Sequence, residues 1–496
     1  MLRILGSPKR LCTGLTRREM LRAGGLSLFG FGLADYFRLN DLQASPKKLH
    51  ASFGKAKACI LLYLYGSPSQ VETFDMKPAA PVEVRGEFKQ IPSSLQGLGV
   101  CELLPNLARE MHRVTVLRSV THPYPIHGVA YATTGVPAID IPMELNPRDA
   151  RHWPYIGCVV DYLTRTAVQH RDIPTNIALP FPFSTRRVGE VARAGPYAAF
   201  LGSAYNPVWT EFHGQGTRNW VKTLQEQKFD GLEPYMGITP ESHFELATAT
   251  ELPAEITLDR LNRRRSLVDQ FDLSRRDLQN GDGGSAHDQY RRMAYDLIGS
   301  AKIRSALDIQ REPRHVRESY GMTLFGQSAL AARRLVEAGS RFVTVIWDEY
   351  GLAGSGWDTH WDHYPRMRNE LLPGFDMGFA GLLRDLDSRG MLDDTLVLCL
   401  SEHGRTPKMQ NVKGGGRDHW SQCYSAVMAG GGVARGRIVG KSDTIGGTVA
   451  ERPISPKEIL ATTYHLLGID PETTIRDRTH RPMPLVQAAA MPEVLA

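Results

Sequence analysis

Short, mostly apolar runs recur along the chain, and such runs are typical of strands that are buried on both faces of a parallel sheet. They cover residues 57–65, 114–120, 341–347, 395–400 and 425–429. Segments with apolar residues at helical spacing lie between or after them, at residues 103–111, 323–337, 371–389 and 455–468. Because strands that alternate with helices form right-handed crossovers, the pattern predicts an α/β fold with a doubly wound, mostly parallel sheet.

Local signals mark the ends of two of these helices. Gly339 lies just beyond 323–337, where a glycine commonly ends a helix. Ser455 and Glu458 have the spacing of a capping box, with Pro456 at the first helical position. The sequence therefore predicts a helix that ends before Gly339 and another that begins after Ser455.

The regular alternation breaks between residues 186 and 320. This stretch begins with irregular sequence rich in glycine, proline and aromatic residues, and continues with charged helical segments at 258–278 and 290–307. Residues 150–185 precede it as a helix and a proline-rich connection. We expect one α/β domain over 51–490, with 186–320 as a partly helical insertion that packs over the sheet and shapes a cleft.

The first fifty residues differ from the rest of the chain. They hold nine Lys and Arg against three Asp and Glu, which accounts for the whole net charge of +6. The remaining chain is neutral, so composition does not support a nucleic-acid partner. Arg17 and Arg18 precede a short apolar run at 23–34, and this order resembles a twin-arginine export signal.

The export hypothesis makes residues 1–50 a leader and linker. It names the twin-arginine machinery as a partner and the periplasm or the exterior as the destination. A basic N-terminus that is disordered or amphipathic is the alternative interpretation. The run at 23–34 is shorter than the roughly 20 apolar residues that span a bilayer, so we expect no stable transmembrane anchor.

Carboxylates and imidazoles gather in turn-prone sequence between residues 356 and 420. The candidate metal ligands there are Asp358, His360, Glu402, His403 and His419. This mixture of oxygen and imidazole donors without thiolates suits divalent ions, with zinc or manganese first and calcium or iron as further options. The alternative to metal binding is that these are loop residues in ordinary salt bridges. Because the clusters follow predicted strands, we favour a metal site.

Two earlier loops offer further candidates. The loop after 57–65 contains Glu72 and Asp75, which would supply enough donors for two metal ions. The loop after 114–120 contains Thr121, His122 and His127. A solvated turn and structural histidines are the alternatives to metal or substrate contacts at these positions.

Arg405 follows Glu402 by three residues. Its planar guanidinium suits a tetrahedral oxyanion such as phosphate or sulfate. Two metal ions about 3.5–4 Å apart would clamp the attacking and leaving oxygens of a displacement at phosphorus or sulfur. Arg405 is therefore a candidate anion-binding residue for such a reaction.

Together with the leader, several motifs resemble those of the DUF1501 family of secreted bacterial proteins, up to about Pro484. They lie at residues 66–69, 74–78, 312–313, 320–321, 327, 332–339, 357–360, 402–407 and 416–420. That family is similar to the alkaline phosphatase and sulfatase superfamily. The resemblance implies an alkaline-phosphatase-like sheet with two metal sites.

Carried over by position, the resemblance implies one metal site at Asp358, His360 and His419. The other would consist of Glu402, His403 and a carboxylate from the loop after 57–65. Glu402 departs from the superfamily, which usually has aspartate before this histidine.

The nucleophile departs from the superfamily as well. Its usual place corresponds to Pro125, and Thr121 is the nearest hydroxyl upstream. His122 and His127 are open as ligands or nucleophiles.

The leading hypothesis is an exported metal-dependent hydrolase of phosphate or sulfate esters. Its substrate would be a small or polymer-borne anionic ester. The competing hypotheses are a non-catalytic exported protein that keeps the fold for binding or assembly, and a metal-dependent phosphotransferase or phosphomutase.

Overall fold

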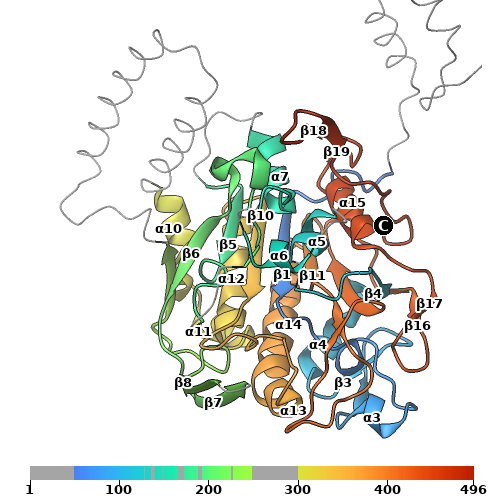
Figure 1. Ribbon diagram of the computed structural model, residues 1–496. Helices are drawn as coiled ribbons and strands as arrows, with labels where there is room; N and C mark the ends of the chain where they lie inside the picture. The colour runs from blue at the N-terminus through green and yellow to red at the C-terminus, as the bar shows by residue number, and fades with distance from the viewer. Residues whose placement is uncertain are drawn as a thin grey trace, which may run out of the picture. The chain divides into compact units, whose positions relative to one another are not determined.

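A nine-stranded sheet lies at the centre of the fold (Figure 1). The computed structural model describes residues 50–247 and 300–496, apart from 128, 136–139, 148, 166–172, 188–192 and 225–226. The strands are, in spatial order, β15 (Arg437–Val439), β4 (Val114–Val120), β14 (Tyr424–Ala429), β11 (Thr395–Leu400), β1 (Ala58–Leu64), β10 (Phe342–Trp347), β5 (Asn176–Leu179), β6 (Val208–His213) and β9 (His243–Leu246).

Most neighbouring strands run parallel. β11, β1, β10, β5 and β6 form an unbroken parallel set, and β15 is parallel to β4. β14 and β9 are antiparallel to their neighbours. The predicted α/β class with a mostly parallel sheet is confirmed. Because β14 runs the other way, its first residue lies at the edge where the parallel strands end.

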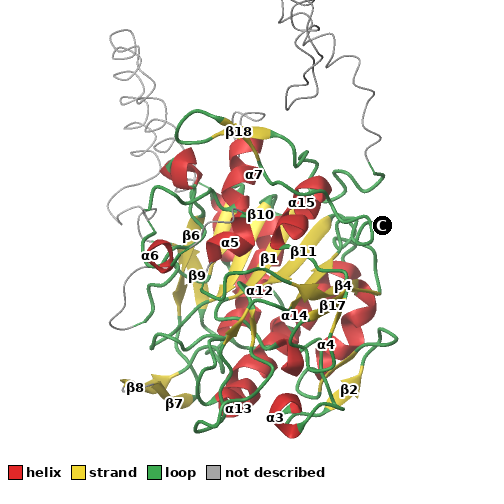
Figure 2. Ribbon diagram, turned by 45° about the vertical axis from the view of Figure 1, so that its right-hand side comes forward, coloured by secondary structure: helices red, strands yellow, loops and turns green. Residues whose placement is uncertain are grey.

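Helices cover both faces of the sheet, and Figure 2 shows them on either side of the strands. Side chains of β1 alternate between the faces: Ile60 and Leu62 belong to one buried cluster, and Leu61 and Tyr63 to the other. The first cluster includes residues of α4 (Pro105–Glu110), α12 (Leu324–Glu337) and α14 (Leu372–Ser388). The second includes residues of α5 (Val129–Thr134), α7 (Ile156–Arg165) and α15 (Pro456–Leu466).

The predicted helix ends are present. α15 begins with the complete capping box of Ser455 and Glu458. The Thr323 hydroxyl accepts a hydrogen bond from the Gly326 amide at 3.1 Å and caps α12. Gly339 follows α12 with a φ of 111°, a conformation that glycine adopts without strain.

Shorter elements complete the fold. The remaining α-helices are α3 (Val82–Arg85), α6 (Ile141–Glu144), α10 (Ala301–Leu307), α11 (Arg314–Ser319) and α13 (His363–Arg366), and a π-helical turn at Met367–Leu371 precedes α14. The two-stranded sheets are β2 (Gln90–Pro92) with β3 (Gly99–Cys101), β7 (Asn219–Leu224) with β8 (Gln227–Leu232), β12 (Gly404–Arg405) with β13 (His419–Trp420), β16 (Lys441–Ser442) with β17 (Val449–Glu451), and β18 (Thr474–Arg476) with β19 (Pro482–Pro484). Turns of 3-10 helix lie at Gln70–Glu72, Met111–Arg113, Ala199–Leu201, Ser203–Tyr205 and Ile309–Arg311.

The region 186–320 contributes strands to the sheet itself. β6 pairs with β5, and β9 pairs with β6, so the described part of this region extends the sheet at one edge. The predicted helix at 258–278, most of the one at 290–307 and the leader at 1–49 lie outside the described residues.

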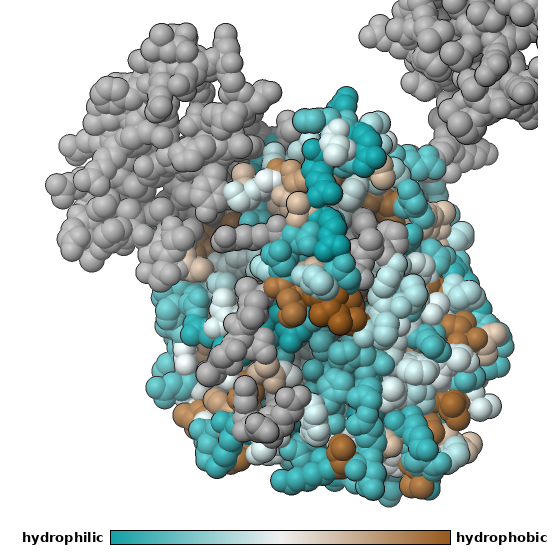
Figure 3. Space-filling model, viewed as in Figure 1, coloured by the Kyte–Doolittle hydropathy of each residue, from teal (hydrophilic) through white to brown (hydrophobic). Residues whose placement is uncertain are grey.

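The face of the molecule in Figure 3 is largely hydrophilic, with hydrophobic side chains in small separate patches. Among the exposed apolar side chains are Ile141 and Leu145, at and just after α6. Within the described part of the chain, no helix combines the length and hydrophobicity needed to span a bilayer.

Candidate metal centre

Several loops meet at one edge of the sheet. β11 is followed at once by Glu402 and His403, and β10 is followed, after a longer loop, by Asp358 and His360. His419 precedes the antiparallel strand β14 and therefore reaches the same edge. In open α/β sheets, the edge where parallel strands end is where ligands bind.

One group of possible metal ligands consists of three histidines. A ring nitrogen of each of His127, His403 and His419 lies within 4.8 Å of the others. The ring centroids of His127 and His419 are 4.2 Å apart, and those of His403 and His419 are 4.5 Å apart. The Nε2 atom of His403 is buried and has no hydrogen-bond partner among the described residues. A buried lone pair of this kind is costly unless it binds something.

A second group shares His419 with the first. It consists of Asp358, His360 and His419, whose ligand atoms also lie within 4.8 Å of one another. The Asp358 Oδ1 atom is 3.0 Å from His360 Nε2 and 3.3 Å from His419 Nε2. The two Nε2 atoms are 3.1 Å apart. A carboxylate and two imidazoles that converge in this way fit a divalent ion.

The histidines are oriented by the hydrogen bonds of their outer nitrogens. His403 Nδ1 donates to the Gly404 carbonyl at 2.8 Å, and His419 Nδ1 donates to the Pro125 carbonyl at 3.2 Å. His360 Nδ1 lies 2.7 Å from the Asp418 carboxylate, and His127 Nδ1 lies 2.9 Å from the Glu402 carboxylate. All four rings therefore turn Nε2 toward the shared centre, as ligating histidines with an outer hydrogen-bond partner do.

Glu402 completes the inner part of the site. Its Oε1 atom accepts hydrogen bonds from the Gly66 amide at 2.7 Å and from His127 at 2.9 Å. Its Oε2 atom is buried and has no hydrogen-bond partner among the described residues. Gly66 has a φ of 95°, and a Cβ atom there would lie 2.3 Å from the Asp358 amide nitrogen. Glycine thus allows the loop after β1 to approach the loop that carries Asp358.

Burial keeps two of the imidazoles neutral. It lowers the pKa of His419 to about 4, against the opposing effect of Asp358. Burial also holds the pKa of His403 well below its usual range, and the nearby His419 and Arg405 lower it further. Neutral imidazoles are the form that binds a metal ion.

The electrostatics of the centre favour a cation. Burial alone would lower the pKa of His127, but Asp358 and Glu402 outweigh it and raise that pKa to about 10. Burial alone would raise the pKa of Asp358, but Arg405 and His127 hold it well below its usual range. The carboxylates thus favour positive charge between them. Without an ion, the proton on His127 supplies that charge, and a metal ion bound by His127 would displace this proton. A divalent ion fits this donor set, with the buried atoms His403 Nε2 and Glu402 Oε2 among its possible contacts.

Asp418 is a site residue that we did not single out from the sequence. The available signal was its position next to His419 in the motif at 416–420. We predict that Asp418→Asn lowers metal affinity about 10–100-fold, because loss of an outer carboxylate partner has effects of this size. Competition with a chelator of known affinity measures the change. Asp393→Asn removes an exposed carboxylate and should leave affinity unchanged; equal affinities of both variants would contradict the orienting role.

Arg405 is buried and contacts the loops of the site. Its Nε and Nη1 atoms donate to the carbonyls of Ser67 and Arg417, each at 3.1 Å. Its Nη2 atom donates to the Gly66 carbonyl and, at 2.6 Å, to Asp358 Oδ1. The structure thus places Arg405 behind Asp358, which it joins to the loop after β1, and not in an open position toward an incoming anion.

The structure does not bring Glu72 or Asp75 into either ligand group. Glu72 is buried and accepts hydrogen bonds from Arg417, including one from Nε at 3.0 Å. Its Oε2 atom is 3.3 Å from His363 Nε2. Asp75 accepts a hydrogen bond from Ser442 and is 3.0 Å from the Lys77 ammonium. Both carboxylates are engaged with side chains outside the histidine centre.

His122 and Thr121 also lie outside the ligand groups. His122 Nε2 donates to the Glu402 carbonyl at 2.7 Å, and its Nδ1 accepts from the Tyr124 amide at 3.2 Å. Burial lowers the pKa of His122 to about 4. Both ring nitrogens of this neutral imidazole are occupied, so His122 supports the backbone of Glu402. The Thr121 amide donates to the Ile454 carbonyl at 2.8 Å, and its hydroxyl has no hydrogen bond to another described residue.

A family model described as "Protein of unknown function (DUF1501)" matches residues 56–495. The chain belongs to the DUF1501 family. The resemblance seen in the sequence is confirmed by this match. No curated protein matches the DUF1501 chain.

Solved structures resemble this DUF1501 protein at low sequence identity. A sulfatase from Pseudoalteromonas sp. is 11% identical, with 84% of this chain and 68% of that chain covered and a TM-score of 0.33. A phosphonate monoester hydrolase from Silicibacter pomeroyi is 11% identical over 84% and 74% of the two chains, with a TM-score of 0.31. That of Agrobacterium radiobacter is 13% identical over 84% and 75%, also with a TM-score of 0.31.

Proposed function

We propose that this DUF1501 protein is an exported, metal-dependent hydrolase of phosphate or sulfate esters. The observation that carries the proposal is the convergence of four Nε2 atoms, from His127, His360, His403 and His419, with Asp358 among them. The outer nitrogens of these histidines all have hydrogen-bond partners. Four imidazoles fixed in this way at a sheet edge are better explained by metal binding than by packing.

The ligand groups support a centre for two ions. His127 and His403 would belong to one of them, and Asp358 and His360 to the other. His419 belongs to both groups, but its single available Nε2 lone pair would serve one ion at a time. The imidazoles suit zinc or iron, and the carboxylate leaves manganese as a further option. The donor set fits calcium poorly because calcium takes oxygen ligands. A bound ion would polarise the ester and activate water for attack.

The protein's own residues then have distinct roles. Arg405 holds Asp358 in place and neutralises part of its charge. Glu402 fixes the ring of His127 through Oε1. The Ser67 hydroxyl accepts a hydrogen bond from the His403 amide at 3.1 Å and is fully buried. Because Ser67 is enclosed in this way and Thr121 lies apart from the ligand groups, we favour direct attack by water over a covalent intermediate.

Arg193 is the better candidate for the contact with the substrate anion. Its guanidinium is 6.0 Å from the ring centroid of Tyr65, and that ring is 5.3 Å from His127. It pairs with Glu144, and 15% of its side chain is exposed. Unlike Arg405, Arg193 thus combines a position beside the centre with access to solvent.

We predict that Arg193→Ala raises KM about tenfold and lowers kcat less. The reason is that a hydrogen bond to a charged group contributes about 1.5–3 kcal/mol. Steady-state kinetics with an aryl ester measures the effects on KM and kcat separately, and Arg193→Lys should restore part of the affinity. Arg384→Ala removes a partly exposed arginine of α14 and is the control. A fall in kcat at unchanged KM would contradict the anion-binding role.

Metal content and ester hydrolysis test the proposal. Purified full-length protein should contain zinc, manganese or iron by elemental analysis, and a chelator should abolish hydrolysis and lower the melting temperature, since a ligand bound only by the native state stabilises it. Aryl phosphates, phosphodiesters and aryl sulfates, each with added zinc or manganese, identify the ester class. Absence of bound metal together with absence of affinity for zinc, manganese and iron would refute the metal centre.

The competing functional hypotheses predict different results in these experiments. Bound metal without hydrolysis of any of these esters would favour a binding or assembly protein, and transfer to an added alcohol would favour a phosphotransferase. Export is tested separately by cell fractionation. Replacement of Arg17 and Arg18 by lysine should retain the protein in the cytoplasm, and unchanged export would refute the twin-arginine hypothesis.

A further inference from the structure

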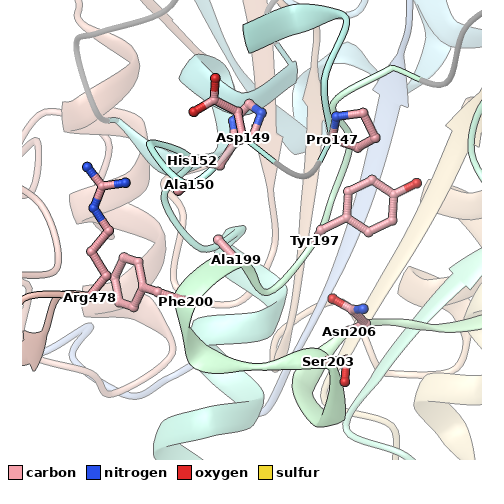
Figure 4. A pocket seen from close by; sticks show the side chains of 10 residues that line it. All are labelled: Pro147, Asp149, Ala150, His152, Tyr197, Ala199, Phe200, Ser203, Asn206 and Arg478. Atoms are coloured by element: carbon pink, nitrogen blue, oxygen red, sulfur yellow. The ribbon is translucent and has the colours of Figure 1, made fainter.

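A pocket of about 690 Å³ is lined by residues other than the candidate metal ligands. This volume is within the range of small-molecule pockets, about 300–1,000 Å³. Figure 4 shows side chains from well-separated parts of the chain around it. The residues that carry the following inference are Asp149, Tyr197, Phe200, Ser203, Asn206 and Arg478.

The polar groups of this pocket are mostly hydrogen-bond donors that are still available. The hydroxyls of Tyr197 and Ser203 and the guanidinium of Arg478 have no hydrogen bond or ion pair with a described residue. The Asn206 Oδ1 atom accepts from the Ala198 amide at 2.8 Å, which fixes the amide group and leaves its Nδ2 available. A pocket rich in free donors suits a ligand rich in oxygen acceptors.

Arg478 supplies the positive charge of the pocket. Asp149 is the acidic lining residue, and its carboxylate accepts hydrogen bonds from the Arg151 amide at 2.8 Å, from Nε at 3.0 and 3.3 Å and from Nη2 at 2.8 Å. Arg151 also pairs with Asp140. Arg478, by contrast, is exposed and has no ion pair with a described residue. A free guanidinium binds sulfate or phosphate oxygens in a planar fork.

Aromatic rings form the apolar part of the pocket. Phe200 lies on the 3-10 turn Ala199–Leu201, and its ring contacts Trp153 edge to face, at 4.9 Å and 80°. Figure 4 shows Phe200 and Arg478 at one end of the pocket and Tyr197 at the other. Rigid rings with free polar groups between them suit the flat C–H face of a sugar, whose hydroxyls would meet the donors.

The pocket and the metal centre are linked through α6. The pocket residue His152 donates from Nε2 to the Met143 carbonyl at 3.1 Å. The next residue, Glu144, pairs with Arg193. The Arg193 guanidinium is 6.0 Å from the ring centroid of Tyr65, and that ring is 5.3 Å from the ring of His127. A ligand in the pocket would thus lie on the side of the centre where Arg193 is found.

We propose that this pocket binds a sugar unit that carries a sulfate or phosphate group, and that it holds part of a glycan whose ester reaches the metal centre. The first half of this proposal stands by itself, and the second rests on the proposed function. Arg478 would bind the anionic group, Tyr197 and Phe200 would contact the ring, and Ser203 and Asn206 would donate to its oxygens.

Titration calorimetry of full-length protein with sulfated lactose, lactose and inorganic sulfate tests the assignment. Sulfated lactose should bind more tightly than either of the others. Arg478→Ala and Tyr197→Ala should each weaken its binding about tenfold, in line with loss of a charged hydrogen bond or of an aromatic contact. Arg476→Ala is the matched control, because Arg476 is also exposed but donates to the His480 carbonyl at 3.0 Å.

The same titration with His403→Ala separates the two proposals. Unchanged sugar binding in that variant would show that the pocket acts independently of the metal centre, even if no ester were hydrolysed. The proposal is overturned if sulfated lactose does not bind, if Arg478→Ala and Arg476→Ala behave alike, or if inorganic sulfate binds as tightly as sulfated lactose.

Discussion

Replacement of His403 by alanine is expected to remove metal from the centre and to lower ester hydrolysis about a thousandfold. His403 is fully buried, is the third residue after β11, and directs an unbonded Nε2 atom toward His127 and His419. Its loss would remove one of three imidazoles from a ligand group. A bound metal ion contributes several kcal/mol to transition-state stabilisation, and about 4 kcal/mol corresponds to a thousandfold in rate.

Elemental analysis and hydrolysis of an aryl ester measure the two effects in the same preparation. His315→Ala removes an exposed histidine of α11 and serves as the control. Circular dichroism and a thermal melt establish that both variants are folded. Full metal occupancy in folded His403→Ala protein would refute the ligand assignment, and full activity without metal would refute the proposed mechanism.

The order of strands explains why part of this centre could be predicted. β1, β10 and β11 are continuous apolar runs, so their ends are visible in the sequence. Parallel strands end at one edge, and side chains that follow them at once must lie there. Glu402 and His403 lie two and three residues after the end of β11, and their position at this edge could therefore be predicted without knowledge of packing.

The directions of other side chains in these loops could not be predicted in the same way. Glu72 belongs to the loop after β1, yet its direction is set by Arg417, which is 345 residues away in sequence. His122 and His127 belong to one loop, but His122 turns toward the Glu402 carbonyl and His127 toward its carboxylate. These directions depend on contacts between distant segments, which spacing along the chain does not encode.

Short strands on one side of the sheet were missed for a different reason. β5 has four residues and lies within what we expected to be a proline-rich connection, followed at once by Pro180. β6 alternates in burial and lies in the region expected to be an insertion. Runs this short do not separate strand from loop by periodicity. The sheet is consequently wider than the long apolar runs indicated.

The Glu72→Gln substitution is expected to destabilise the protein by about 3 kcal/mol without removing metal from the molecules that remain folded. Glu72 and Arg417 are both fully buried, and the loss of one partner leaves an uncompensated charge, which costs about 3–5 kcal/mol. Burial alone would raise the pKa of Glu72, but Arg417 and His363 outweigh it and lower that pKa from 4.5 to about 2. This difference corresponds to about 3 kcal/mol at about 1.4 kcal/mol per pKa unit.

The direction of the pKa shift of Glu72 determines how the stability of the protein depends on pH. Because the folded-state pKa is lowered, this stabilisation is present above the unfolded value of 4.5 and is lost as the pH falls toward about 2. Urea denaturation between pH 7 and pH 3 should therefore show a gap between wild type and Glu72→Gln that narrows in acid. Glu87→Gln, which breaks an exposed pair with Arg368, should change stability by about 0–1 kcal/mol.

The same variant decides between the two interpretations of Glu72. If Glu72 is a metal ligand, the Glu72→Gln variant should bind less metal, and the stability of the metal-free protein should change little. If Glu72 is instead the buried partner of Arg417, the variant should lower the stability of the metal-free protein. The molecules that remain folded would still bind metal through the histidines and Asp358. Arg417 also donates its backbone amide to the Thr359 carbonyl at 3.0 Å, between Asp358 and His360. The ion pair at Glu72 therefore supports the ligand-bearing loop from behind, and its loss should lower stability first and occupancy only through unfolding.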